Sequence, residues 1–263
     1  MKVNRGVAPF LAISTSKVLL VPYEASHVTT YHEWMQDKEI QAATASEPLS
    51  LEEEYEMQSK WRNDRDKLTF IVCEPLSSQK FEIKANVEDA PRRMIGDVNL
   101  FISANGADEE GCIGELELMV ALKSRRRQGY GRAATVAFLH YISLHIHDIR
   151  NEFLRTSISS EKNTLSQHDP AASNSWKQPR EDFHMTVKIG EDNPSSINLF
   201  ESLGFVKTDD KANFFGEFEL SLGRNVTEAW TRDLMQKYGV EDYKELPYVP
   251  SNSELKSKGA ADD

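Results

Sequence analysis

The sequence predicts an α+β fold in which a central β-sheet is flanked by helices. Asn193 opens a short segment whose apolar residues recur at helical spacing, and this segment stops at Gly204 and leads into an apolar strand. Earlier in the chain, residues 126–131 form a glycine-containing turn between an apolar strand and a helix. Elsewhere, apolar runs of strand length alternate with helical patterns, which indicates both element types over most of the chain.

The N-terminal half is predicted to alternate between strands and helices. The helices lie at 27–35 and 51–61, where apolar and aromatic side chains recur every three or four residues. Ser50 can cap the second helix, ahead of glutamates near its positive end. The polar residues 74–93 are expected to form a long surface loop. Strands are expected at 17–22, 68–73, 94–102 and 113–120.

The C-terminal half continues this pattern around one interruption. A helix follows the turn at 126–131. Residues 152–181 are rich in polar residues and lack apolar periodicity, so a disordered insertion is expected there. Residues 226–240 can form an amphipathic helix, and a loose tail is expected beyond Glu245. The sheet is expected to resume with strands at 183–189, 204–208 and 214–222.

These segments divide the chain into three parts. An N-terminal segment spans 1–15, one folded domain spans 16–225 with the insertion inside it, and a C-terminal helix with a flexible tail spans 226–263. A chain of 263 residues is long enough for one large domain with such additions.

The composition narrows the classes of function. A formal net charge of −11 argues against a broad nucleic-acid surface, because phosphate binding needs clustered Lys and Arg. Arg125 begins a small basic patch near the turn. Cys73 and Cys112 lie in apolar runs, which favours buried thiols over a disulfide scaffold. No segment has enough consecutive apolar residues to span a bilayer. We therefore expect a cytoplasmic protein without a nucleic-acid or membrane partner.

The turn and the capped helix, in this order and about 65 residues apart, resemble the two coenzyme A-binding elements of the GNAT acetyltransferase superfamily. The resemblance implies a GNAT fold with a mixed sheet, and acetyl-CoA as co-substrate. Glycines in the turn would let the backbone approach the pyrophosphate at the positive end of the following helix. An ordinary strand-to-helix turn is the alternative. The cofactor-binding residues expected here are Arg126, Arg127, Gln128, Gly129, Tyr130, Gly131 and Arg132.

Two glutamates in the strand before the turn are candidates for a general base. Alternation along 114–120 places Glu115, Glu117 and Met119 on one face of that strand. Two carboxylates on one face, beside apolar neighbours, can raise each other's pKa. Glu115 lies fourteen residues before Gly129, the spacing of the base in histone-type GNAT enzymes, and Glu117 is nearer the expected acetyl group. A solvated strand face is the alternative.

The resemblance also implies how the cofactor arm is held. The end of this strand would splay from its neighbour, so that backbone N–H groups near Met119 and Val120 meet the pantetheine arm and the acetyl carbonyl. Asn193 and Ser196 resemble the family's contacts to the same arm from the other side.

Two positions depart from the family pattern. Many GNAT enzymes carry a tyrosine at the position of Phe200, the remaining cofactor-binding candidate, and its hydroxyl protonates the departing thiolate. Phe200 cannot do so, although a thiol with a pKa of about 8.5 can leave as thiolate near neutral pH. Tyr130 is a candidate substitute. Arg127 stands where a glycine is commoner in the family.

The N-terminal third narrows the resemblance to the N-acetyltransferase 9 family, the tubulin N-acetyltransferases. Several uncommon short motifs of that family occur in the same order in this chain, over roughly residues 16–222. This resemblance implies acetylation of protein N-termini, with alpha- and beta-tubulin as substrates. The motifs include Leu20-Val-Pro-Tyr23, Tyr31-His-Glu-Trp-Met35, Gly96-Asp-Val-Asn-Leu-Phe101 and Gly114-Glu-Leu-Glu-Leu-Met119.

The residues are consistent with an N-terminal amine as acceptor. A free α-amine has a pKa near 8 and a lysine near 10.4, so deprotonation at pH 7 costs roughly 1.4 kcal/mol for the first and about 5 kcal/mol for the second. Glu33 and Glu47 are the candidate substrate-binding residues, because an acidic rim attracts an ammonium group. Trp34 and Met35, beside them, are expected to pack in the core.

Two other functions are compatible with the same residues. A non-catalytic acetyl-CoA-binding or microtubule-associated scaffold would keep the fold without turnover. A small-molecule acetyltransferase would share the sheet and differ in the substrate groove. A metal site is not expected, because His145 and His147 have no further ligand accompanying them.

Overall fold

One mixed β-sheet runs through the structure. The computed structural model describes residues 11–104, 111–161 and 183–251. Its strands are β1 (Leu11–Ser14), β2 (Leu19–Pro22), β3 (Lys67–Cys73), β4 (Ile83–Lys84), β5 (Met94–Ala104), β6 (Cys112–Val120), β7 (Phe183–Gly190), β8 (Phe205–Lys207), β9 (Glu217–Leu222) and β10 (Lys244–Val249). They follow the order β4-β10-β1-β2-β3-β5-β6-β7-β9-β8. The pairs β4–β10 and β6–β7 are parallel and the other pairs are antiparallel, which confirms the expected mixed sheet.

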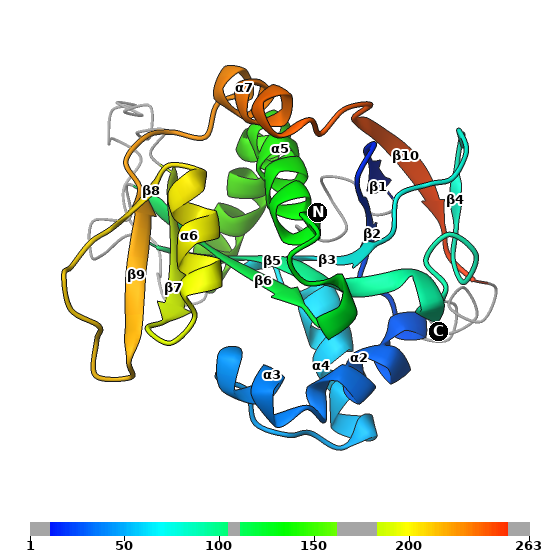
Figure 1. The fold of residues 1–263 in the computed structure, drawn as a ribbon, viewed down its shortest axis with the longest axis horizontal. Helices are drawn as coiled ribbons and strands as arrows, with labels where there is room; N and C mark the ends of the chain where they lie inside the picture. The colour runs from blue at the N-terminus through cyan, green and yellow to red at the C-terminus, as the bar shows by residue number, and fades with distance from the viewer. Residues whose placement is uncertain (1–10, 105–110, 162–182, 252–263) are drawn as a thin grey trace, which may run out of the picture.

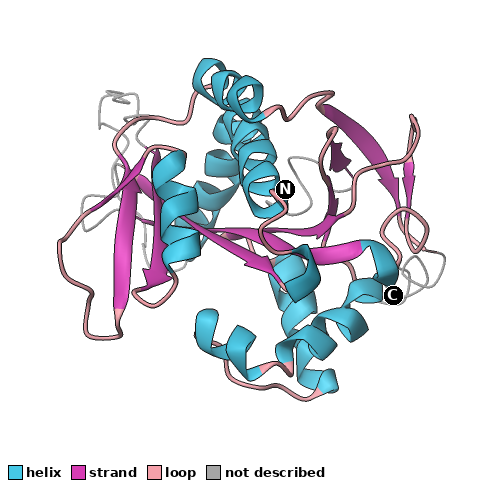
Figure 2. Cartoon of the chain, in the orientation of Figure 1, coloured by secondary structure: helices cyan, strands magenta, loops and turns pink. Residues whose placement is uncertain are grey.

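Helices lie on both sides of this sheet (Figures 1 and 2). Within the described residues, none of them has the length and apolar character needed to cross a membrane. Figure 1 shows α5 and α7 above the central strands and α2, α3 and α4 below them. The α-helices are α2 (Val28–Met35), α3 (Lys38–Ala43), α4 (Leu51–Asn63), α5 (Tyr130–Glu161), α6 (Pro194–Ser202) and α7 (Glu228–Tyr238). The 3-10 helices are η1 (Ala25–His27), η2 (Pro91–Arg93) and η3 (Lys123–Arg125).

Side-chain alternation along the central strands builds a separate core on each face. Phe70 of β3 points toward α5, where its ring centre lies 5.7 Å from that of Phe138. Ile71, the next residue, faces the opposite side and packs in the cluster that contains α2. Trp34 and Met35 of α2 are buried in this second cluster, as expected.

The expected strands and helices are present, and apart from the C-terminal end of α5 their ends lie within about three residues of those predicted. Ser50 caps α4 in a reciprocal arrangement: its hydroxyl accepts from the Glu53 N–H, and the Glu53 carboxylate accepts from the Ser50 N–H at 2.8 Å. Cys73 and Cys112 are buried free thiols, also as expected.

Sequence reasoning missed several short elements, three of which are the strands at one end of the sheet. β10 pairs with β1, and its residues Leu246 and Tyr248 are buried, so the tail expected beyond Glu245 begins later than predicted. β1, β4 and α3 were also not predicted. α5 continues to Glu161, into the segment expected to be an insertion, and residues 162–181 of that segment lie outside the described residues.

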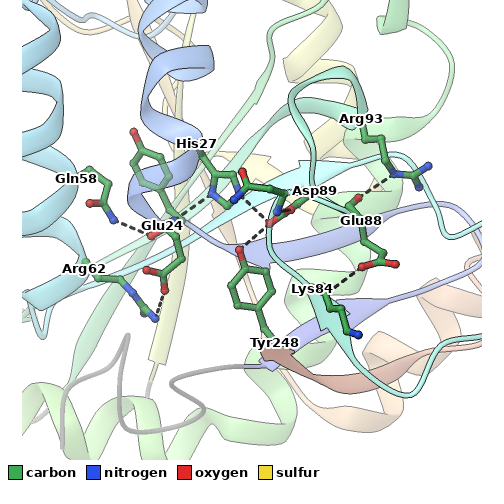
Figure 3. A network of polar contacts seen from close by, with 11 residues as sticks. Glu24, His27, Gln58, Arg62, Lys84, Glu88, Asp89, Arg93 and Tyr248 are labelled. Carbon is green, nitrogen blue, oxygen red and sulfur yellow. Dashed lines mark hydrogen bonds and ion pairs between the residues drawn. The ribbon is translucent and has the colours of Figure 1, made fainter. Parts of the chain in front are cut away.

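A buried polar network ties β10 to the start of the helical layer (Figure 3). The N–H of Glu24 donates to His27 Nδ1 at 3.1 Å, which leaves His27 Nε2 to donate to Asp89 Oδ2 at 2.9 Å. Tyr248 of β10 donates its hydroxyl to the same oxygen at 2.6 Å. Burial raises the pKa of Asp89, but the hydrogen bonds from His27 and Tyr248 outweigh it and hold that pKa below its usual range.

Removing the Tyr248 hydroxyl leaves a buried carboxylate oxygen with one donor fewer. Tyr248→Phe is therefore expected to lower the free energy of unfolding by about 1–3 kcal/mol in urea denaturation. Tyr55→Phe is the matched control, because Tyr55 is 40% exposed, and a change below about 0.5 kcal/mol is expected. Equal effects of the two substitutions would show that the network does not secure β10.

Candidate active site

The candidate site lies where two neighbouring parallel strands separate. β6 and β7 pair only as far as Glu115 and Thr186. β6 nevertheless continues to Val120 on β5, and β7 continues to Gly190 on β9. Beyond Glu115, the edge of β6 that faces β7 therefore has no pairing strand among the described residues. This is the divergence that the resemblance implied.

The two glutamates of β6 differ in their surroundings. Lys188 of β7 donates to Glu115 at 2.7 Å and forms an ion pair with it. Glu117 has no hydrogen bond or ion pair with any described residue. Solvent reaches its carboxylate, yet enough protein lies around it that desolvation, followed by the charges of Asp97 and Glu115, raises the pKa of Glu117 to about 7. Lys188 acts in the opposite direction and does not cancel the shift.

A buried polar cluster lies next to Glu117 on β5. Asn99 stands opposite Glu117 in the ladder, and Asp97 stands opposite Met119. Asp97 accepts hydrogen bonds from the Tyr31 hydroxyl of α2 at 3.2 Å and from the Asn99 amide at 2.9 Å. Burial nevertheless raises the pKa of Asp97 to about 6.

The turn before α5 presents backbone N–H groups. Gly129 has a φ of +89° and Arg127 a φ of +62°, so both lie in the left-handed region. This explains why a glycine is commoner at the position of Arg127 in the family. The Ala133 N–H donates to the Gly129 carbonyl at 2.9 Å, so the N–H groups of residues 130–132 precede the helical ladder.

Gly131 has a different role from Gly129. A Cβ at Gly131 would lie 3.1 Å from Leu118 of β6 and 3.4 Å from Leu199 of α6, so its absence lets three elements meet. A Cβ at Gly129 would meet nothing within 4 Å. The guanidinium of Arg132, the next residue, lies 4.8 Å from the ring centre of Tyr238.

Arg126 links the turn to α3. Its Nε donates to the Val120 carbonyl at 3.0 Å, and its Nη1 lies 3.2 Å from a Glu39 carboxylate oxygen. Lys123 forms a further ion pair with Glu39, and also one with Asp37 at 3.3 Å. Sequence reasoning did not find these ion pairs. The contact of Arg126 with a phosphate stays a prediction.

The start of α6 lies against the same turn. Asn193 accepts from the Ser196 N–H at 3.1 Å and so caps the helix. Arg127 donates to the Ser195 hydroxyl at 3.2 Å, which joins the two predicted cofactor elements. Phe200 lies on the inner face of α6, 4% exposed, with its ring packed on the core. Its contact with a cofactor also stays a prediction.

The other predicted site residues lie at the surface or beside it. Glu33 of α2 and Glu47 of the α3–α4 loop are both exposed. Gln128 is exposed and donates to the Ser124 carbonyl. Tyr130, the first residue of α5, is partly buried and packs against the core. No described contact assigns a chemical role to these four predicted residues.

A family model described as an acetyltransferase (GNAT) domain matches residues 17–206. The chain belongs to the GNAT acetyltransferase family. It is 35% identical over 248 residues to an N-acetyltransferase 9-like protein of Schizosaccharomyces pombe, a match that covers 85% of this chain and 99% of that protein. It is 36% identical over 221 residues to the alpha/beta-tubulin-N-acetyltransferase 9 of Drosophila melanogaster, covering 84% and 90%. The human protein of that name is 33% identical over 239 residues, covering 90% and 93%.

These matches place the chain among the N-acetyltransferase 9 members of the GNAT family, and it is therefore an acetyltransferase. The GNAT fold implies that acetyl-CoA binds, and the residues present fit such a ligand. The N–H groups before the α5 ladder suit a pyrophosphate. The open edge of β6 beyond Glu115 offers backbone groups to an extended arm.

Residues outside the predicted set also border the site. Asp97, Asn99 and Tyr31 are not among the predicted site residues. A signal for the first two was present, because they are polar at alternate positions of an otherwise apolar strand and so share one face. Their contact with Tyr31 depends on how α2 docks on the sheet, which local sequence does not specify.

The left-handed backbone of Gly129 makes a side chain there costly. Gly129→Ala is expected to reduce the free energy of unfolding by about 1–2 kcal/mol. It should also weaken acetyl-CoA binding in calorimetry, because the turn that presents the N–H groups must shift. Gly223→Ala is the matched control, since Gly223 has open space around it and no positive φ, and neither quantity should change. Equal behaviour of the two variants would contradict this interpretation.

Proposed function

We propose that this acetyltransferase moves the acetyl group of acetyl-CoA onto the α-amine of a protein N-terminus by direct attack in a ternary complex, with alpha- and beta-tubulin as the substrates. The names of the Drosophila and human relatives support the substrate. The observation that carries the mechanism is Glu117, a carboxylate without a partner among the described residues, with a pKa of about 7, at the open edge of β6.

Glu117 is proposed to act as the general base. Acetyl-CoA supplies the acyl group as a thioester, and the attacking amine must lose a proton as its nitrogen bonds to the carbonyl carbon. A base is most effective when its pKa lies near the working pH, which Glu117 satisfies. Glu115 is less suited, because its carboxylate is held in an ion pair with Lys188.

An α-amine is the better matched acceptor for such a base. The ammonium form must first lose one proton to solvent, which at pH 7 costs roughly 1.4 kcal/mol for an α-amine and about 5 kcal/mol for a lysine. Glu117 then takes the second proton, which the nitrogen loses as it bonds to the carbonyl carbon. The exposed Glu33 and Glu47 are proposed to attract the ammonium form of the incoming N-terminus.

The remaining residues are proposed to hold the cofactor. The backbone near Met119 and Val120 would meet the arm and polarise the acetyl carbonyl. The turn from Arg126 to Arg132 would hold the pyrophosphate, and Asn193 and Ser196 would border the arm from α6. Phe200 offers no hydroxyl to the leaving thiolate, which is proposed to leave unprotonated.

Acetylation of matched peptides tests the reaction. Peptides with the tubulin N-terminal sequences, one with a free and one with a blocked α-amine, are incubated with the protein and acetyl-CoA, and intact mass is measured. The expected result is the mass of one acetyl group, added only to the free amine. Clear acetyl-CoA binding with no addition to peptide or to intact tubulin would support the scaffold alternative. Faster acetylation of a polyamine than of the peptide would support a small-molecule enzyme.

Glu117→Gln tests the base. For the wild type, kcat/KM is expected to fall as pH falls through about 7, because protonated Glu117 cannot accept a proton. The variant should lose this acid limb and be slower by about 100-fold or more. Glu115→Gln is the matched control and should keep the acid limb. Unchanged rates and pH profiles in both variants would exclude either glutamate as the base.

A further inference from the structure

Two buried polar side chains of β5 lie on the same face of the sheet as Glu117. Asn99 is opposite Glu117 in the antiparallel ladder, and Asp97 is two residues before Asn99, so the three side chains project from one face of the sheet. Asp97 is 1% exposed and Asn99 is 4% exposed. Polar groups buried this deeply normally have all their hydrogen bonds satisfied by protein or by water.

The hydrogen bonding of this pair is incomplete among the described residues. Tyr31 and Asn99 both donate to Asp97 Oδ2. Asp97 Oδ1 and Asn99 Oδ1 are buried, and no described residue donates to them. Both atoms are acceptors, so whatever completes them must be a donor. A carboxylate of Glu117 cannot donate, but a carboxylic acid can.

We propose that Asp97 and Asn99 form a buried acceptor pair that positions Glu117 for proton uptake. When Glu117 takes a proton from the substrate amine, its new O–H donates to Asn99 Oδ1 or Asp97 Oδ1, directly or through one water. The proton comes from the amine nitrogen and stays on Glu117 until solvent removes it, so no other reactant is needed. This inference rests on the proposed role of Glu117 as the base.

The pair stabilises the protonated form of Glu117 in two ways. Acceptors aimed at a carboxyl group favour the form that can donate, and a negative neighbour disfavours a second negative charge. The charge of Asp97 raises the pKa of Glu117, so removing that charge is expected to change the titration of Glu117. The hydrogen bond from the Asn99 amide nitrogen to Asp97 orients the amide, so that its oxygen is the remaining acceptor.

Other charged groups around the pair do not replace this effect. On the Glu117 side, these are Glu115 of the same strand, Lys188 of β7 and Glu217 of β9. Lys188 opposes the shift but is already paired with Glu115. On the Asp97 side, Tyr31 of α2 donates a hydrogen bond, and Tyr23 lies close enough for the charge of Asp97 to affect it. Glu54 of α4 affects both tyrosines but not Glu117.

The titration of Glu117 itself tests the proposal. In the full chain labelled with ¹³C at the glutamate carboxyl carbon, the Glu117 resonance is assigned by its loss in Glu117→Gln and followed against pH. Asp97→Asn is expected to lower the pKa of Glu117 by about one unit. The acid limb of kcat/KM should move to lower pH by the same amount, with a lower plateau because the base is weaker.

Two further variants keep the result interpretable. Glu54→Gln removes a carboxylate that is as buried as that of Asp97 but does not border Glu117. It should therefore change neither the pKa of the Glu117 resonance nor the acid limb of kcat/KM. Tyr31→Phe keeps Asp97 but removes a donor that favours its ionised form, so it should lower the pKa of Glu117 by a smaller amount. If Asp97→Asn does not fold, Tyr31→Phe decides the question.

The outcomes separate this inference from the proposed function. A Glu117 resonance that titrates unchanged in both Asp97→Asn and Tyr31→Phe would overturn the acceptor pair, since a merely structural role of Asp97 predicts that result. A resonance that shifts while the acid limb stays in place would uphold the pair and show that Glu117 is not the base.

Discussion

The point at which β6 and β7 stop pairing is the constraint on which the rest of the site depends. β6 cannot follow β7, because it stays paired with β5 as far as Val120. Gly96 of β5 allows this close pairing, because a Cβ at that position would lie 1.8 Å from the Met119 carbonyl oxygen. β7 is held in turn by β9 through Gly190. The sheet therefore opens at a fixed place, just beyond Glu115.

Groups of different chemistry meet at this opening. On one side, the turn and the first residues of α5 and α6 come together through Gly131 and the Arg127–Ser195 hydrogen bond, and they present N–H groups suited to an anion. On the other, the face of β5 and β6 presents Glu117 above a buried polar cluster that also anchors α2. A phosphate-bearing acyl donor is negatively charged and a protonated amine is positively charged. The N–H groups suited to the first and the carboxylate suited to the second lie on opposite sides of the opening.

The sequence predicted this arrangement unevenly. The capped helix at Asn193 and the turn at Gly129 were recognisable because each depends on a local backbone requirement that few residue types meet. Asn is a preferred helix cap, and Gly is the preferred residue for left-handed backbone. The two base candidates followed from strand alternation alone. Their ranking did not, because it depends on Lys188, which reaches Glu115 from a strand more than sixty residues later. Strand β10, which lies between β4 and β1, was missed because its short apolar run is interrupted by Pro247, and only its partner strands show that Leu246 and Tyr248 are buried.

The most direct test of this account is a crystal structure of the protein with acetyl-CoA. We predict that the pantetheine arm lies between the ends of β6 and β7 and that the pyrophosphate lies at the N–H groups of residues 130–132. The acetyl carbonyl should lie beside Met119 and Val120, within reach of Glu117. An arm that runs elsewhere, or a β6–β7 ladder that closes on binding, would contradict the central claim.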